Sequence, residues 1–135
     1  MLNHSETIRV RYGETDQMGY VYYGNYALYY EVGRVELLRK LGIAYCELEK
    51  QGIGLPVVSF EIQYTKPAKY DDLIVIETSI IEKPNTKISF LYTCKDQQGN
   101  CLNTGKVVLV FINLKTSKPI RCPHNLDILF KSHFK

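Results

Sequence analysis

The sequence contains no tryptophan, only three histidines and no long apolar run among its 135 residues. The histidines lie near the two termini and do not cluster: they are His4, His124 and His133. A zinc site is therefore not expected. No apolar stretch approaches the roughly 20 residues that cross a membrane as a helix, so no membrane span is predicted. The N-terminal segment MLNHSETIRV also lacks the basic and then apolar order of a signal peptide.

Cysteine is present but not in a metal-binding or redox spacing. The four cysteines form no Cys-x-x-Cys pair: they are Cys46, Cys94, Cys101 and Cys122. Because nothing in the sequence points to export, we expect reduced thiols and a cytoplasmic location. The formal net charge of +3 is small and its Lys and Arg residues are dispersed, which argues against a nucleic-acid partner. Residues 1–135 contain no repeats or linkers and are predicted to form one domain.

The most informative stretch runs from Arg11 to Leu41, where a loop leads into a long apolar helix. The loop carries Asp16 and is interrupted by three glycines: Gly13, Gly19 and Gly24. Asn25 is predicted to cap the helix, because its side chain can accept a hydrogen bond from an unpaired amide of the first turn. An acidic side chain a few residues before a helix N-terminus is an arrangement that can do chemistry.

The predicted helix, from Asn25 to Leu41, has apolar residues on two sides. One stripe, at spacings of three or four, contains Tyr26, Tyr30, Gly33, Leu37 and Leu41. The other contains Leu28, Val32 and Val35. This pattern predicts a helix surrounded by other structure. Gly33 weakens a helix, so its presence indicates that a neighbouring backbone comes close there.

Most of the remaining chain has the composition of β-strands. Strands are predicted over residues 7–12, 56–65, 73–82, 86–95 and 106–114, and short helices over 44–50 and 123–134. Val107 to Ile112 is apolar at every position and is predicted to be buried on both faces. Ile74, Ile76 and Ile80 would add to an apolar outer face if they point away from the helix, and such a face favours self-association. The order of elements predicts the α+β class, with an antiparallel sheet wrapped around one long helix.

The run TDQMGYVYYGNYALYYEVGRVELLRKLG resembles the signature of hot-dog-fold acyl-CoA thioesterases, in the 4-hydroxybenzoyl-CoA thioesterase and YbgC-like group. The features that carry the resemblance are Asp16, Gly19, Tyr22 with Tyr23, Asn25 with Tyr26, and Arg34 with Glu36. KPAKYDDLIVI and KPIRCP also look like segments of this family, although some YbgC-like members have a His where this chain has Gly24. The resemblance implies the hot-dog fold and a homodimer joined edge to edge, or a tetramer of two such dimers. It also implies an acyl-CoA or acyl-carrier-protein thioester as substrate, with no further cofactor.

Thioester hydrolysis needs a nucleophile, or a base that activates water, and a group that stabilises negative charge on the carbonyl oxygen. Amides around Tyr23 to Tyr26 would stabilise the charge on the carbonyl oxygen, because first-turn amides lack intrahelical partners. The resemblance implies that Asp16 is the nucleophile, or the general base that activates water. Tyr23 is a candidate for orienting substrate or water. The candidates for substrate binding are Gly24, Asn25 and Tyr26 at the helix start, Ser59 from the partner subunit, and Lys66 against the phosphates of coenzyme A.

Simpler interpretations compete with each of these assignments. Asp16 is also a plausible turn residue, Tyr23 a packing residue and Lys66 a solvated charge. Glu36 occupies a helix position where other hot-dog thioesterases place a catalytic carboxylate, but an ion pair with a neighbouring Arg or Lys is the expected use. A non-catalytic module that binds acyl thioesters is the alternative function, and it predicts ligand affinity without thiol release. A hot-dog dehydratase is disfavoured, because those enzymes pair a His with a carboxylate and no His lies near this loop.

Overall fold

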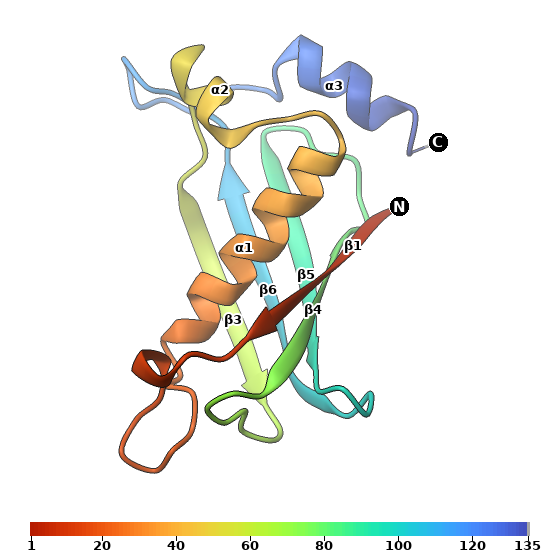
Figure 1. The fold of residues 1–135 in the computed structure, drawn as a ribbon. Coiled ribbons are helices and arrows are strands. Elements are labelled where there is room, and N and C mark those ends of the chain that lie inside the picture. Colours follow the sequence, from red (N-terminus) through yellow and green to blue (C-terminus); the bar gives the residue numbers. More distant parts are fainter. Residues whose placement is uncertain (135) are drawn as a thin grey trace.

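The computed structural model describes residues 1–134, which form an antiparallel sheet with one long helix across a single face (Figure 1). The five strands of this sheet follow the order β1-β4-β5-β6-β3. Their bounds are Leu2–Arg9 (β1), Val57–Tyr64 (β3), Leu73–Ile80 (β4), Lys87–Lys95 (β5) and Cys101–Val110 (β6). A second, two-stranded sheet pairs β2 (Ile53–Gly54) with β7 (Ile112–Asn113).

The long helix is α1, Asn25–Lys40, and a short 3-10 turn, Tyr12–Glu14, precedes it in the loop after β1. Two shorter helices, α2 (Tyr45–Lys50) and α3 (His124–Lys131), lie at the opposite end of the molecule from that loop (Figure 1). The chain ends approach each other, since the Met1 ammonium donates to the carbonyl of His133 at 2.9 Å. No helix within residues 1–134 has the length and apolarity that crossing a bilayer requires.

Helix α1 packs closely on β4 because both elements present small or apolar side chains to each other. Along β4 every second residue is buried: Ile74, Ile76, Thr78 and Ile80. These isoleucines therefore face the core, and the alternative that they form an outer apolar face is wrong. A Cβ on Gly33 would overlap Oγ1 of Thr78 and lie 3.0 Å from Cγ2 of Ile76. Gly33 thus marks a close approach, as predicted, but to side chains of β4 rather than to a backbone.

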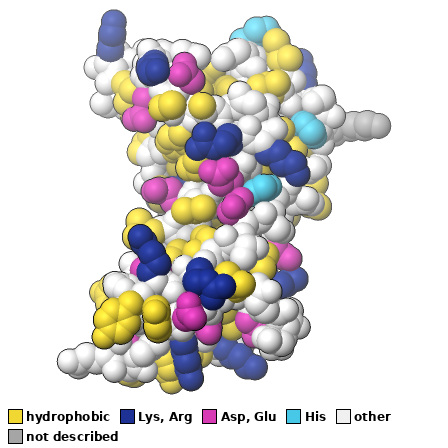
Figure 2. All heavy atoms as spheres, in the orientation of Figure 1, with side chains coloured by type: hydrophobic (Ala, Val, Ile, Leu, Met, Phe, Trp, Pro, Cys, Tyr) yellow, Lys and Arg dark blue, Asp and Glu magenta, His cyan; other side chains and the backbone are white. Residues whose placement is uncertain are grey.

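The outer side of α1 is open, which contradicts the prediction of a helix surrounded by other structure. Leu28 is 55% exposed and Val32 is 40% exposed. On the face that carries α1, hydrophobic side chains lie between charged ones and do not form one continuous patch (Figure 2). Within residues 1–134 the sheet buries one apolar stripe of α1 and α2 contacts the helix, but a single five-stranded sheet does not reach the second stripe.

Strand β6 also differs from its predicted bounds. It begins at Cys101 and ends at Val110, where the chain leaves the sheet toward β7. Burial alternates from Val107 to Leu109, where Val108 is half-buried, but Leu109 and Val110 are then buried in succession. The prediction that this segment is buried on both faces is therefore met only in part.

Candidate active site

Asp16 lies at the tip of a tight loop that holds one of its carboxylate oxygens in place. Its Oδ1 accepts hydrogen bonds from the amides of Met18, at 3.0 Å, and Tyr20, at 3.2 Å. The Asp16 amide in turn donates to the Tyr20 carbonyl at 2.8 Å. Gly19 closes the loop with a φ of 79°, a left-handed conformation that glycine adopts without strain. Oδ2 accepts no hydrogen bond from residues 1–134, so it is the oxygen left available for chemistry.

The Asp16 side chain lines a cleft of about 320 Å³. The other lining residues are Met18, Tyr20, Val21, Tyr23, Tyr26, Tyr64, Thr65, Lys66 and Pro67. Tyr26 and Tyr64 meet across it with ring centroids 5.7 Å apart. Burial raises the pKa of Tyr26 to about 12, so its hydroxyl is neutral at pH 7 and can donate a hydrogen bond. The cleft therefore combines one carboxylate and one lysine with a wall that contains four tyrosines.

Helix α1 begins at Asn25, as predicted, but its cap is a different residue. Gly24 is the N-cap and Asn25 is the first helical residue, so the prediction of Asn25 as the cap is wrong. The Asn25 side chain instead donates to the carbonyl of Glu14 at 2.8 Å. This contact pulls the side chain back toward the loop, away from the first-turn amides that a capping side chain would accept from.

The amides available at this helix start are fewer than the sequence suggests. The amides of Asn25, Tyr26 and Ala27 already donate to the carbonyls three residues earlier, at 2.8, 3.3 and 3.3 Å. Within residues 1–134 the amides of Tyr23 and Gly24 have no acceptor. Because the positive end of the helix dipole adds to them, these two N–H groups are the candidates for holding an oxyanion.

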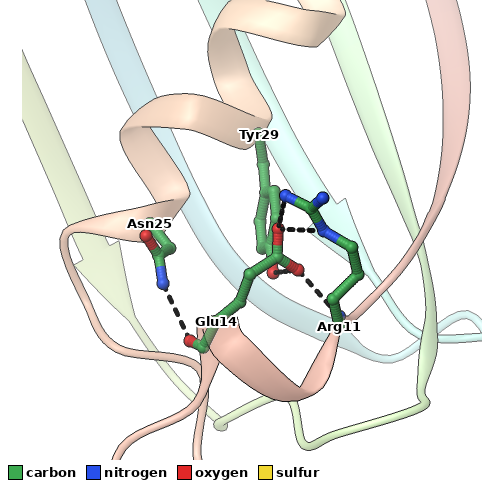
Figure 3. Close-up of polar contacts among 4 residues, drawn as sticks. All are labelled: Arg11, Glu14, Asn25 and Tyr29. Atoms are coloured by element: carbon green, nitrogen blue, oxygen red, sulfur yellow. Dashed lines mark hydrogen bonds and ion pairs between the residues drawn. The ribbon is translucent and has the colours of Figure 1, made fainter.

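Glu14 connects the loop to the helix, and the sequence reasoning did not single it out (Figure 3). Its carboxylate accepts hydrogen bonds from the Arg11 amide and the Tyr29 hydroxyl, both at 2.8 Å. Burial alone would raise the pKa of Glu14, but the bonds from Arg11 and Tyr29 outweigh it and hold the pKa below its usual value. The Arg11-x-x-Glu14 spacing was a visible signal for part of this cluster, whereas nothing in the sequence pointed to Tyr29.

The structure brings together four of the predicted site residues and leaves three outside the cleft. Asp16, Tyr23, Tyr26 and Lys66 line it. Gly24 and Asn25 form the adjoining helix start without lining the cleft. Ser59 lies on β3, five positions before Tyr64, and its role across a subunit contact stays a prediction. Glu36 pairs with Arg39 at 3.3 Å, which is the structural use expected of it.

A sheet with one long helix across it, and a carboxylate in a cleft at the start of that helix, defines the hot-dog thioesterase class. The chain belongs to the thioesterase-like superfamily, whose family model matches residues 10–129. Within that family it is an acyl-CoA thioesterase of the YbgC-like group.

The similarity to named relatives extends over most of each chain. The protein YneP of Bacillus subtilis (strain 168) is 37% identical over 114 residues, which cover 84% of this chain and 83% of YneP. The acyl-CoA thioester hydrolase YbgC of Escherichia coli O6:H1 is 29% identical over 124 residues, 92% of both chains. The crystal structure of a DHNA-CoA thioesterase from Staphylococcus aureus superposes with a TM-score of 0.94 at 32% identity, covering 98% of this chain and 91% of that one.

Proposed function

We propose that Asp16 hydrolyses the acyl-CoA thioester while the amides of Tyr23 and Gly24 hold the carbonyl oxygen. The observation that carries this proposal is the position of the Asp16 carboxylate, which has one free oxygen in a cleft beside two unpaired helix-start amides. Charge that develops on the thioester oxygen would be stabilised by those amides in a partly dehydrated site.

Two routes are open to the carboxylate. As a nucleophile, Asp16 would add to the carbonyl carbon and expel the coenzyme A thiolate, and water would then split the resulting anhydride. As a general base, Asp16 would take a proton from water as the water oxygen adds to the same carbon, and the tetrahedral adduct would then expel the coenzyme A thiolate, which takes up that proton. A burst of thiol equal to the enzyme concentration would support the first route.

The other cleft residues have proposed roles in binding. Tyr23 is 65% exposed and would orient the acyl group or the attacking water, and Lys66 would pair with the phosphates of coenzyme A. Tyr26 would shape the wall of the cleft, while Gly24 and Asn25 would act from the adjoining helix start. We propose that the reaction uses no separate cofactor, because coenzyme A, or an acyl carrier protein, is part of the substrate.

An aromatic acyl group fits this cleft best. Four of its lining residues are tyrosines, which offer flat apolar faces for stacking. Its volume of about 320 Å³ lies at the lower end of the usual range for ligand pockets, about 300–1,000 Å³. The S. aureus relative is named for DHNA-CoA. Turnover of a panel of aryl-CoAs and straight-chain acyl-CoAs, with the released thiol detected by a chromogenic reagent, tests this preference, and a higher kcat/KM for long straight chains would contradict it.

Asp16→Asn tests the mechanism, and the chain supplies a matched control. Asp96 builds the same kind of loop, since its Oδ1 accepts from the amides of Gln98 and Asn100, both at 2.9 Å, and Gly99 has a φ of 85°. Asp96 does not line the cleft. We expect Asp16→Asn to lower kcat by about 10²–10⁴-fold, and Asp96→Asn to leave it unchanged. An Asp16→Asn protein as active as the parent would show that the proposed mechanism is wrong.

We also propose a homodimer as the working assembly, with tetramer formation as a further step. Strand β3 is at the edge of the five-stranded sheet, and Val57, Val58, Phe60 and Tyr64 on it are 47%, 53%, 40% and 49% exposed. An uncovered edge strand with large apolar side chains is a surface that another strand can pair with. Tyr64 also lines the cleft, so a second copy on β3 would lie next to the site.

A further inference from the structure

The loop that carries Asp16 is held to the segment after β3 by a bridge between Tyr20 and Lys69 and by a hydrogen bond from the Val21 amide to the Ala68 carbonyl at 2.8 Å. Its tip runs from Asp16 to Tyr20, and its two arms meet where Thr15 bridges Val21 and where the Tyr22 amide donates to the Glu14 carbonyl at 2.9 Å. The outgoing arm continues directly into α1. The separation between the Asp16 carboxylate and the amides of Tyr23 and Gly24 therefore depends on these contacts and on how the base of this loop is held.

Glu14 holds that base through its backbone and its side chain together (Figure 3). The Glu14 carbonyl accepts from the Tyr22 amide and from the Asn25 side chain, at 2.9 and 2.8 Å. Its Oε1 accepts from the Tyr29 hydroxyl at 2.8 Å, and its Oε2 accepts from the Arg11 guanidinium at 3.1 Å. One residue thus links the incoming arm, the outgoing arm and the second turn of α1.

Glu14 does not face the substrate. It is absent from the lining of the cleft, and its side chain is only 14% exposed beneath Arg11. Both carboxylate oxygens already accept two hydrogen bonds each, so neither is free to take a proton from water. Any effect of Glu14 on the reaction must therefore pass through the residues that it holds.

We infer that Glu14, with Tyr29 as its anchor on α1, is a positioning residue that sets the distance between Asp16 and the oxyanion amides. This inference rests on the proposed function of Asp16. Reaction rates are sensitive to such distances, because a displacement of about 1 Å at the reacting groups can cost about 10²-fold in rate. Removing the Tyr29–Glu14 bond deletes the link from the Glu14 side chain to α1, keeps the bonds to the Glu14 carbonyl and leaves the carboxylate of Asp16 intact.

Tyr29→Phe is the sharpest test, since it deletes one hydroxyl and keeps the ring that packs edge-on against Tyr26 at 5.7 Å. We expect kcat to fall by about 10–100-fold, with KM changed less than about threefold because the cleft wall is unaltered. Affinity for a non-hydrolysable thioether analogue of the acyl-CoA should match that of the parent. Glu14→Gln should lower kcat similarly, and the double variant should lose less than the product of the two effects because the residues share one bond.

Tyr45→Phe is the matched control. It removes a half-buried tyrosine hydroxyl that donates to the Leu55 carbonyl at 3.2 Å, at the other end of α1. A comparable loss of Tm in both Tyr→Phe variants, with kcat lowered only in Tyr29→Phe, supports positioning. If Tyr29→Phe and Glu14→Gln both keep the kcat of the parent while Asp16→Asn is inactive, the positioning role of Glu14 is wrong and the proposed function stands. An active Asp16→Asn protein would instead overturn the proposed function.

Discussion

The Glu14 carboxylate makes the stability of this protein depend on pH in the acid range. Its pKa in the folded state is below the ordinary value of 4.5, so the folded protein favours its charged form. This contribution is complete above about pH 4.5 and is lost as the pH falls through the folded-state pKa. We expect the parent to exceed Glu14→Gln in free energy of unfolding at pH 7, and the difference to shrink below pH 4.5.

Urea unfolding of both proteins between pH 7 and about pH 3 measures this difference. Glu36→Gln is the control, because the exposed Glu36–Arg39 pair is of the surface type that contributes about 0–1 kcal/mol. A Glu14→Gln deficit that grows in acid would contradict the assigned direction.

The four cysteines differ in their accessibility to thiol reagents. Cys46 is exposed, whereas Cys94 is fully buried and both Cys101 and Cys122 are half-buried. Burial raises the pKa of both Cys94 and Cys122 to about 12, so little thiolate forms at neutral pH. We expect the rapid phase of modification by a chromogenic thiol reagent to come from Cys46, and Cys94 and Cys122 to react only in denaturant.

Cys46→Ser should abolish that rapid phase and leave kcat unchanged, since Cys46 does not line the cleft. A rapid phase that persists in Cys46→Ser would contradict this assignment. The variant is also a practical background for assays that detect released coenzyme A with the same reagent.

Local sequence alone does not distinguish the Asp16 loop from the Asp96 loop. The segments DQMGY and DQQGN close with the same carboxylate-to-amide hydrogen bonds and a left-handed glycine. Only the surroundings separate them, because one loop enters the start of α1 beside a cleft and the other joins two strands of a hairpin. The family resemblance supplied that distinction for Asp16. No resemblance marked Glu14, whose partner Tyr29 is brought near by the fold.

At the scale of whole elements, the packing of α1 on β4 depends on Gly33. Alanine is the better helix former by about 1 kcal/mol, yet its Cβ at position 33 would overlap the side chain of Thr78. We expect Gly33→Ala to lower the free energy of unfolding by about 1–3 kcal/mol, because α1 must move away from the sheet.

Chemical denaturation of Gly33→Ala and of Gly13→Ala tests this prediction. A Cβ at Gly13 meets no atom within 4 Å, so Gly13→Ala should change stability by less than about 0.5 kcal/mol. A stabilised Gly33→Ala would mean that helix propensity outweighs the close approach.

Strand β6 shows why element bounds were harder to predict than element types. Its first half, CLNTG, has a composition typical of turns, yet it is strand in the structure. Asn103 is buried there because its side chain accepts from the Tyr30 hydroxyl at 2.5 Å. A Cβ on Gly105 would overlap the Tyr30 ring, which occupies that space. The conformation at both positions depends on contacts with Tyr30, a helix residue more than seventy positions away. No local sequence pattern reveals such contacts.

At the scale of the whole molecule, the exposed edge of β3 predicts a homodimer. Phe60 and Tyr64 lie on the helix side of β3. The ring centroid of Phe60 is 5.9 Å from that of Tyr30, and the ring centroid of Tyr64 is 5.7 Å from that of Tyr26. Phe60 and Tyr64 nevertheless remain 40% and 49% exposed. Pairing of two β3 strands would bury these side chains and satisfy the free backbone groups of both edges. Because Tyr64 lines the cleft, the dimer contact and the site share this strand.

Val58→Asp places a charge near the start of that edge strand, at a side chain that is 53% exposed in the single chain. We expect it to shift the protein from dimer to monomer in size-exclusion chromatography with light scattering, because a buried unpaired carboxylate opposes association. Activity should fall together with the dimer fraction. Leu28→Asp introduces the same charge at an apolar side chain of α1 that is 55% exposed and is not part of β3, so it should leave the dimer intact. If Leu28→Asp dissociates the dimer and Val58→Asp does not, the dimer contact lies on the outer face of α1 and not on β3. If the parent protein is a monomer with full activity, the cleft needs no second copy.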